Sequence, residues 1–396
     1  MAHPARVLIV VQNLSVPLDR RVWLECQALV AAGHQVSVIC PRDPGQAAHR
    51  TLDGVRIHTY PPPKPRSGVV GYMAEFVYCW LRTALLSLHV SRREGFDVMQ
   101  ACNPPDTYWL LGRIWRLAAR KRFVYDQHDL NPEVYEARFG KRGILHKGLL
   151  LLERATYASA DHVISTNESY RETALTRGGV PLERTTIVRS APDPERMRRG
   201  EPDPALRRGR THLICYLGIM GPQDGVDRLL GALDHLVHVQ GRTDIHLGLL
   251  GFGDCFDELT EQCSALGLDD YVTFTGKVGP PEIHRWLSTA DLGVTPDPKN
   301  DFNDKSTMNK TLEYMAYELP VVGFDLVENR RSAGEAGVHV RADDDAALAR
   351  AIGELLDDPD RRSRMGALGR KRIEDSLNWA AQEGPYVDVY RRYARR

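Results

Sequence analysis

Short apolar runs alternate with amphipathic stretches along the first half of the chain. Residues 7–11 and 35–40 are rich in Val and Ile, which is typical of strands that are buried in a parallel sheet. Between them, residues 19–32 carry apolar side chains at helical spacing and stop at Gly33, which predicts an amphipathic helix. The alternation continues to residue 188, so the pattern predicts a doubly wound α/β domain with functional groups at the carboxyl ends of its strands.

A change of composition separates this half from the next. Residues 190–210 are rich in Pro, Arg and Gly, which predicts a linker, and strand–helix alternation restarts at residue 212. We therefore expect an α/β fold of two Rossmann-like, doubly wound domains that face each other across a cleft, residues 1–192 and 193–375. The helical tail, residues 376–396, is expected to pack back on the first domain.

Composition excludes several classes of protein. With 52 basic and 52 acidic side chains among 396 residues, the chain has no net charge that would attract nucleic acid. Its seven cysteines form no CxxC pair and show no metal-ligand spacing, which indicates free thiols in a reducing compartment. The N-terminal apolar run is too short for a signal peptide. We therefore expect a cytoplasmic protein.

A longer apolar stretch, residues 68–90, needs a separate interpretation. Two charged side chains and a histidine interrupt it, which argues against a helix that spans a membrane. Two interpretations remain: a helix packed on the domain core, or an interfacial helix over residues 70–92 with Arg82, Arg92 and Arg93 near lipid headgroups. The second predicts peripheral contact with the inner face of a membrane.

Glycines cluster at two strand ends of the second domain. Gly218, Gly221 and Gly225 lie between a predicted strand and a predicted helix, and Gly251 and Gly253 follow the next strand. Glycine permits close backbone approach, and the N-terminus of the following helix points N–H groups at an anion. The cluster fits a tight turn without a ligand equally well.

The segment from residue 300 to 323 contains the strongest candidates for ligand-binding residues. Ser306 and Thr307 are expected to cap a helix that carries Lys310 and Glu313. With Lys305 and Lys310 near that helix N-terminus, the segment predicts a diphosphate site, and Glu313 suits a ribose diol. The alternative is an ordinary surface helix with a Lys310–Glu313 pair.

In the first domain, His128 follows a predicted strand and lies between Asp126 and Asp129 in the sequence. This histidine suits an orienting or proton-handling role, or a structural role in the loop. The loop that enters the first helix at residues 12–25 has no glycine, and the GxGxxG fingerprint is absent there, which disfavours a nicotinamide enzyme. Walker A, GxSxG and HExxH sequences are absent as well.

Together these segments resemble the GT-B-fold glycosyltransferases of sequence family 4, a retaining family. The resemblance runs from residue 7 to the C-terminal helix, and it is nearest to the branch that builds bacterial surface polysaccharides or modifies natural products. The segments that carry it are residues 19–25, 125–129, 216–225, 309–316 and 320–322.

The resemblance implies a nucleotide-sugar donor held by the second domain and an acceptor held by the first. It implies that Glu313 contacts the nucleotide ribose and that His128 lies close to the transferred sugar. The implied donor site comprises Gly218, Gly221, Gly251, Gly253, Ser306, Thr307, Met308, Asn309 and Glu313. The candidate catalytic residues are His128, Lys305 and Lys310, and the acceptor side comprises Asp19, Arg20, Arg21, Asp126 and Asp129.

Two motifs depart from the family pattern. The first acid of its paired-glutamate motif falls at Lys305, and Gln223 and Asp224 stand where a lysine usually precedes the loop glycine. We expect Lys305 or Lys310 to supply the missing charge. The resemblance also implies a front-face substitution in which the leaving phosphate helps to deprotonate the acceptor hydroxyl. No protein nucleophile, metal ion or cofactor is then expected.

Other functions of the same architecture remain open at this stage. A GT-B-fold epimerase consumes a nucleotide sugar without an acceptor, and a phosphorylase depends on pyridoxal phosphate. A non-catalytic sugar-nucleotide-binding subunit is a third alternative. For a transferase we expect a UDP-sugar first and a GDP-sugar next, with a saccharide, a lipid-linked saccharide or a small molecule as the acceptor.

Overall fold

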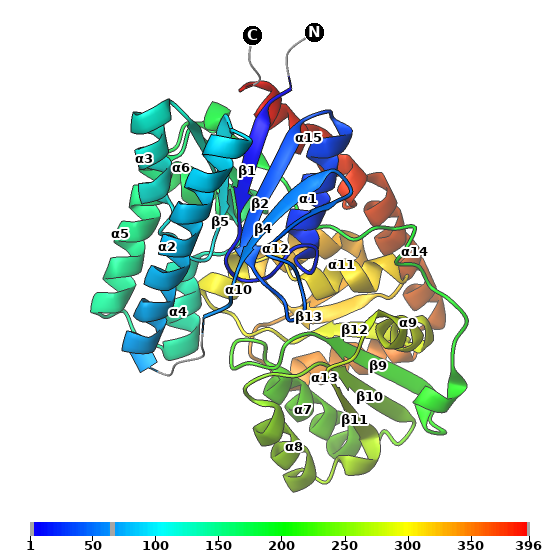
Figure 1. Cartoon of the computed structure of the whole chain (residues 1–396). Helices are drawn as coiled ribbons and strands as arrows, with labels where there is room; N and C mark the ends of the chain where they lie inside the picture. Colours follow the sequence, from blue (N-terminus) through cyan, green and yellow to red (C-terminus); the bar gives the residue numbers. More distant parts are fainter. Residues whose placement is uncertain (1–3, 64–67, 394–396) are drawn as a thin grey trace. The chain divides into compact units, whose positions relative to one another are not determined.

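The computed structural model describes residues 4–63 and 68–393 (Figure 1). The chain divides into two compact units, one formed by residues 1–190 with 380–396 and the other by residues 191–379. The division falls inside the linker predicted from composition. Residues 394–396 of the predicted C-terminal helix lie outside the described part.

The first unit contains a sheet of eight strands in the order β3-β4-β2-β1-β5-β6-β7-β8. Its neighbouring strands are parallel, except that β3 and β4 pair antiparallel. The strands are β1 (Arg6–Val10), β2 (Gln35–Pro41), β3 (His49–Leu52), β4 (Val55–Tyr60), β5 (Val98–Cys102), β6 (Arg122–Gln127), β7 (His162–Ser165) and β8 (Thr185–Ile187).

Helices cover both faces of this sheet because each face carries apolar side chains. Leu8 and Val10 pack in one core with Trp115 and Tyr157 from α3 and α5. On the other face, Tyr386 of α15 reaches Gln100 of β5. The helices are α1 (Arg20–Ala31), α2 (Gly68–Arg93), α3 (Trp109–Ala119), α4 (Asn131–Phe139), α5 (Ile144–Ser159), α6 (Glu168–Thr176) and α15 (Trp379–Arg391).

The second unit contains a parallel sheet of six strands in the order β11-β10-β9-β12-β13-β14. The strands are β9 (His212–Leu217), β10 (Ile245–Leu250), β11 (Val272–Gly276), β12 (Leu292–Thr295), β13 (Val321–Phe324) and β14 (Gly337–Val340). The helices are α7 (Val226–Asp234), α8 (Phe256–Ala265), α9 (Pro280–Thr289), α10 (Asp301–Lys305), α11 (Asn309–Ala316), α12 (Val327–Ala333), α13 (Asp345–Leu356) and α14 (Pro359–Asp375).

Two apolar cores lie on the two faces of this second sheet. Leu247 and Val294 pack with α7 and α13 in one core, whereas Leu213 packs with Trp286 of α9 and Met315 of α11 in the other. A doubly wound sheet of this kind binds ligands where the strand order reverses. That switch point lies between β1 and β5 in the first unit and between β9 and β12 in the second.

Helix α2 has one buried face and one exposed face. Cys79, Thr83 and Val90 are buried, whereas Leu81 and Leu85 are more than half exposed. The interpretation of this stretch as a core-packed helix is therefore right for one face only. Among the described residues, none of the helices combines the length and the apolar character that crossing a membrane requires.

Candidate functional site

The glycines of the second unit bring backbone segments together at the carboxyl ends of β9 and β10. A Cβ atom on Gly251 would lie 1.8 Å from the Gly218 carbonyl oxygen, so only glycine fits there. A Cβ atom on Gly253 would lie 2.5 Å from the Met220 carbonyl oxygen, which is also too close. These glycines are thus required for the packing of two loops at the switch point.

The loop before α11 differs from the prediction. Asn300 accepts hydrogen bonds from the backbone of a short helix, α10, and Ser306 is at the C-terminal end of that helix, where its hydroxyl donates to the Phe302 carbonyl at 2.8 Å. Helix α11 begins at Asn309, after Met308, whose side chain makes no capping hydrogen bond. Helix α11 therefore begins later than predicted, with Met308 and not Ser306 or Thr307 at its N-cap position, because Ser306 ends α10.

Lys310 lies in the first turn of α11 and is almost completely buried. Its Nζ donates to Asp297 Oδ1 at 2.8 Å and to the Tyr216 hydroxyl at 3.4 Å. The Lys310 and Asp297 side chains are only 9% and 2% exposed. Burial alone lowers the pKa of Lys310, but Asp297 and Asp224 raise it above its ordinary value, so the side chain is charged at neutral pH. The alternative of a surface Lys310–Glu313 pair does not describe Lys310.

Asp224, which stands where the family usually has a lysine, accepts hydrogen bonds from its own loop. Its Oδ2 accepts from the Gly221 backbone N–H at 2.9 Å and from the Gln223 side chain at 3.0 Å. Burial raises the pKa of Asp224 to about 6, against the opposing effect of Lys310. The loop therefore satisfies one of its own N–H groups with a carboxylate, where an anion was expected to bind.

The other predicted donor residues lie close by in sequence and in the fold. Lys305 is the last residue of α10 and is half-buried. Glu313 is half-buried in the second turn of α11, and Asn309 is exposed at its start. The side chain of Asn303, which the sequence analysis did not single out, donates to the carbonyls of Gln223 and Pro298 and joins α10 to the glycine loop.

In the first unit, Arg21 is the centre of a buried polar network. Its guanidinium donates to Asp126 Oδ1 at 2.9 Å and to the Val188 carbonyl at 2.8 Å, and its Nε lies 3.1 Å from Glu25 Oε1. Burial opposes ionisation of Asp126, but Arg21 and His128 hold the pKa of this carboxyl below its usual range. Burial and Asp126 together raise the pKa of Glu25.

His128 is held at the end of β6 by two contacts. Its Nε2 lies 2.7 Å from Asp126 Oδ2, and its backbone N–H donates to Asn103 Oδ1 at 2.6 Å. Arg21 Nε donates to the same ring nitrogen, His128 Nε2, at 3.1 Å. Within the described part of the chain, its Nδ1 makes no hydrogen bond. The imidazole is therefore oriented by its neighbours.

The remaining predicted residues of this unit have simpler roles. Asp19 caps α1 by accepting from the Val22 N–H at 3.1 Å, which contributes about 1 kcal/mol. Arg20 is exposed on the first turn. Asp129 donates its N–H to Asn103, and burial raises the pKa of its carboxyl. The structure thus brings together Arg21, Asp126 and His128, while Asp19 and Arg20 are on the adjoining helix start.

Sequence reasoning missed the side chains beneath this network. Gln100 donates to Glu25 Oε2 at 2.8 Å and to Asp126 Oδ2 at 3.0 Å, and its own carbonyl oxygen accepts from Tyr386 and Tyr390. A buried glutamine in an otherwise apolar strand is the signal that sequence offers for such a network. The C-terminal helix is thereby joined to the centre of the first sheet.

Cys102, Asp126 and His128 also lie close enough together to be considered as metal ligands. The structure does not favour that role. Both Asp126 oxygens already accept hydrogen bonds from Arg21 and Gln100. Burial, Asp126 and Glu25 raise the pKa of the Cys102 thiol, so it is protonated at neutral pH and is a poor ligand.

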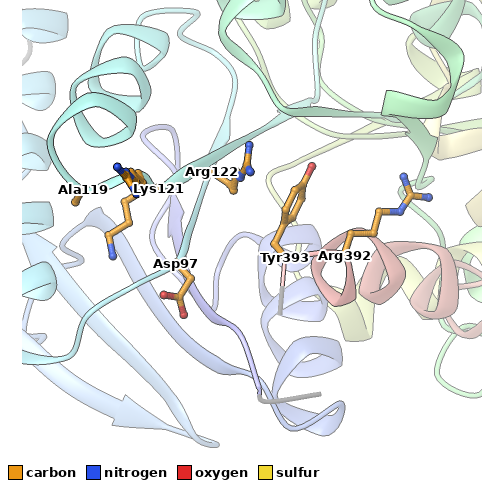
Figure 2. A pocket seen from close by; sticks show the side chains of 7 residues that line it. Asp97, Ala119, Lys121, Arg122, Arg392 and Tyr393 are labelled. Atoms are coloured by element: carbon orange, nitrogen blue, oxygen red, sulfur yellow. The ribbon is translucent and has the colours of Figure 1, made fainter. Parts of the chain in front are cut away.

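A cavity of about 360 Å³ lies elsewhere in the first unit (Figure 2). It is lined by Asp97 and Lys121, which precede β5 and β6, and by Arg122, Arg392 and Tyr393. Asp97, Lys121 and Arg122 are at the amino ends of β5 and β6, opposite to the edge that carries His128, and Arg392 and Tyr393 follow α15. The cavity is therefore separate from the candidate site.

Comparison with solved structures identifies the fold. Sucrose-phosphate synthase from Thermosynechococcus elongatus matches with a TM-score of 0.75 at 20% identity, over 98% of each chain. An Anabaena protein solved in complex with UDP and glucose matches with a TM-score of 0.73 at 16% identity, over 97% of this chain and 99% of that one. Two Rossmann-like units of this kind have the GT-B fold of glycosyltransferases.

Sequence comparison gives the family. A model described as glycosyl transferase 4-like domain matches residues 18–191, and one described as glycosyl transferases group 1 matches residues 211–358. The chain belongs to these glycosyltransferases. D-inositol 3-phosphate glycosyltransferase 1 of Catenulispora acidiphila is 26% identical over 75% of this chain and 72% of its own length.

A second relative is similar along almost its whole length. It is the GDP-mannose-dependent alpha-(1-6)-phosphatidylinositol monomannoside mannosyltransferase of Mycolicibacterium smegmatis. It is 27% identical over 84% of this chain and 97% of its own length.

Proposed function

We propose that the protein is a retaining glycosyltransferase that moves a sugar from a nucleotide-diphosphate sugar to a hydroxyl group. The acceptor is a saccharide, a lipid-linked saccharide or a small molecule. The observation that carries the proposal is the placement of polar groups at the carboxyl edge of both sheets, Lys310 at one switch point and Arg21 with His128 at the other. Membership of the glycosyltransferase family supports it.

The donor is assigned to the second unit. The glycine loops pack on each other at the carboxyl ends of β9 and β10, and α11, which follows β12, begins at the same edge of the sheet and offers its first N–H groups there. Lys305 and Lys310 supply positive charge to the diphosphate, and Glu313 accepts hydrogen bonds from the ribose. A UDP-sugar is the first choice because a structural neighbour was solved with UDP, and a GDP-sugar is next because a relative is named as GDP-mannose-dependent.

His128 orients a hydroxyl of the transferred sugar. The imidazole is well suited to this because Asp126 and Asn103 hold its ring and its backbone, so little freedom is lost when a sugar binds. In the reaction, the bond between the anomeric carbon and the diphosphate oxygen breaks while the acceptor oxygen attacks from the same face. The acceptor proton passes to the leaving phosphate, so neither a protein nucleophile nor a metal ion takes part.

The first experiment measures thermal unfolding in the presence of UDP, GDP, TDP and CDP. A nucleotide that binds only the folded protein raises the melting temperature, and we expect UDP to give the largest shift. Glu313→Gln should reduce that shift, whereas Glu354→Gln, on the exposed side of α13, should not. If no nucleotide shifts melting, the donor site is not where we place it.

The second experiment identifies the reaction. The preferred donor is incubated with and without a panel of saccharide and lipid-linked acceptors, and the anomeric configuration of the product is read by nuclear magnetic resonance. An α-linked product from an α-linked donor supports retention. A changed nucleotide sugar without acceptor identifies an epimerase, and binding without hydrolysis or transfer identifies a non-catalytic subunit.

We also propose peripheral membrane contact through residues 70–92. Leu81 and Leu85 are one helical turn apart on the exposed face of α2, and the exposed Arg92 and Arg93 follow at its end. An apolar face beside cations is typical of an interfacial helix. Sedimentation with anionic vesicles tests this: Leu81→Gln with Leu85→Gln should reduce binding, and Leu182→Gln, exposed elsewhere in the same unit, should not.

A further inference from the structure

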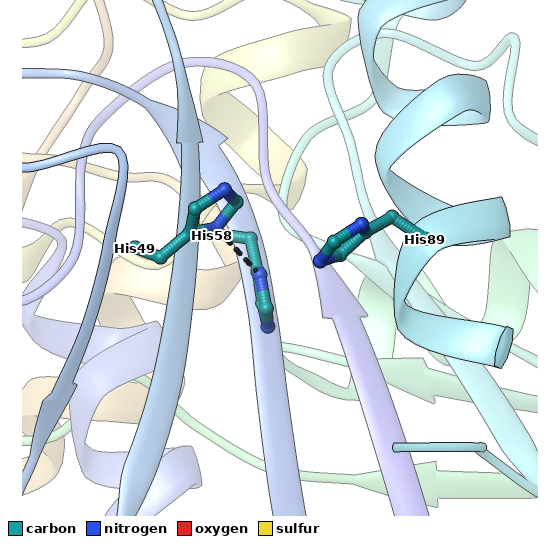
Figure 3. A group of neighbouring side chains, drawn as sticks. All are labelled: His49, His58 and His89. Carbon is teal, nitrogen blue, oxygen red and sulfur yellow. Dashed lines mark hydrogen bonds between the residues drawn. The ribbon is translucent and has the colours of Figure 1, made fainter. Parts of the chain in front are cut away.

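Three histidines from three different elements meet at the edge of the first sheet (Figure 3). His49 is on β3, His58 is on β4, and His89 is on α2. One ring nitrogen of each lies within 4.8 Å of the others. This cluster is distinct from the network around Arg21, and the proposed transfer reaction does not use it.

The backbone explains why the rings converge. His49 and His58 are directly opposite each other in the antiparallel β3–β4 pair, so their side chains lie on the same face of the sheet. Helix α2 packs against this face and presents His89, whose ring stacks on His49 with the centroids 5.4 Å apart. The centroids of His58 and His89 are 6.0 Å apart.

The distances within the cluster suit coordination of one ion. Nδ1 of His49 and Nδ1 of His58 are 3.0 Å apart. Two nitrogens bound to a tetrahedral Zn²⁺ at about 2.0–2.1 Å are about 3.3 Å apart, so this pair needs a shift of only a few tenths of an ångström. His49 is exposed, which leaves solvent access for a water molecule as the fourth ligand.

A carboxylate on the far side of His58 supports the same interpretation. Glu94 Oε1 lies 3.0 Å from His58 Nε2, the ring nitrogen that does not face His49. Glu94 is itself held by the Ser37 hydroxyl at 2.6 Å and by Arg56 at 3.3 Å. Metal-binding histidines generally have such a carboxylate on their second nitrogen, because it fixes the ring with the other nitrogen toward the metal.

We propose that His49, His58 and His89 bind one divalent ion of the zinc type, with Glu94 as the positioning residue. Three imidazoles and a water are ligands that suit Zn²⁺ and its neighbours among the transition metals. The ion joins the β3–β4 hairpin, which is at the sheet edge, to α2. Its role is thus to stabilise the elements that carry the exposed apolar face of α2.

The experiment uses the full, untagged chain after treatment with a chelator. Zn²⁺ is titrated by calorimetry, and Co²⁺ is used as a spectroscopic substitute because its visible absorption reports tetrahedral nitrogen ligation. We expect one ion per chain and a higher melting temperature with Zn²⁺. His49→Gln and His89→Gln should each weaken binding by more than about 100-fold, and Glu94→Gln by about 10- to 100-fold.

Two further variants locate the bound ion. His238→Gln, an exposed histidine of the second unit, should bind Zn²⁺ as the unchanged protein does. His128→Gln tests the other group of possible ligands and should also leave binding intact. The proposal is overturned if His49→Gln and His89→Gln, folded by circular dichroism, bind Zn²⁺ unchanged. Absence of the tetrahedral Co²⁺ spectrum, or loss of binding in His128→Gln alone, overturns it as well.

Discussion

Lys310 forms a buried ion pair with Asp297 and is also proposed to bind the donor diphosphate. Replacing Lys310 by Met tests these two roles separately. Met keeps most of the volume of the side chain but removes the ammonium group. Asp297 then loses its partner at 2.8 Å while its carboxylate stays 98% buried, because the side chain is only 2% exposed. Asp297 Oδ2 has no hydrogen bond in the described structure, so no other group compensates the charge.

The expected destabilisation follows from this burial. Removing one partner of a buried ion pair costs about 3–5 kcal/mol, because the other charge is left without water or a counter-ion. The substitution Asp297→Asn in the same chain removes that charge, so Lys310→Met with Asp297→Asn should recover most of the free energy of unfolding. Lys299→Met is the matched control, since Lys299 pairs with Asp304 while 47% exposed and should cost less than about 1 kcal/mol.

Urea unfolding, followed by fluorescence and by circular dichroism, measures these effects. For a slope of about 2–3 kcal/mol/M, the Lys310→Met transition of the second unit should move down by about 1–2 M. The double variant should unfold near the unchanged protein but should still bind the donor nucleotide weakly. A loss below about 1 kcal/mol in Lys310→Met, or donor binding fully recovered in the double variant, would refute this reasoning.

Three other predictions concern the remaining charged groups. Arg21→Lys should destabilise the first unit by about 2–4 kcal/mol in urea unfolding, because one ammonium cannot replace the several guanidinium hydrogen bonds, while exposed Arg20→Lys should change it by less than about 0.5 kcal/mol. Asp224→Asn should stabilise the protein relative to the unchanged chain by an amount that grows from pH 3.8 to about 6 and then levels in urea unfolding, since the raised pKa of Asp224 means that its ionised form is disfavoured on folding. His128→Gln should lower kcat for sugar transfer by about 100-fold with an unchanged Kd for the nucleotide, and an equal loss of nucleotide binding would contradict an orienting role.

Much of the fold could be predicted from local pattern. The apolar runs of a doubly wound sheet are nearly continuous, so β1, β2 and α1 are visible in the sequence as residues 7–11, 35–40 and 19–32, close to the observed bounds. The expectation that chemistry gathers at strand ends follows from topology, and Asp126 and His128 lie at the end of β6, whereas Arg21 was assigned from the family resemblance alone. The importance of Gly218 and Gly251 can also be predicted from the sequence. In the structure these glycines allow two loops to pack closely against each other.

What the sequence did not show depends on contacts between distant segments. In the sequence, Ser306 and Thr307 are two consecutive residues that favour helix capping. Nothing there indicates that Asn300 caps a separate short helix with Ser306 at its C-terminal end. The partner of Lys310 is Asp297, on a different loop, and not Glu313 in the same helix. Likewise, the histidines at 49, 58 and 89 have no motif spacing, because a hairpin register and a helix packing bring them together.

The two strand-end sites share one electrostatic feature that bears on how ligands bind. In each unit a buried cation is already paired with carboxylates: Arg21 with Asp126 and Glu25, and Lys310 with Asp297. Pairing keeps these cations ionised inside the protein, but it also reduces the positive potential that Lys310 presents to a diphosphate. Binding of a dianion therefore requires further positive potential, from Lys305 and the first N–H groups of α11, because Asp297 offsets part of the charge of Lys310. On this argument, removing Lys305 should weaken nucleotide binding without the loss of stability expected for Lys310, and calorimetric titration of Lys305→Ala with UDP is the measurement that separates them.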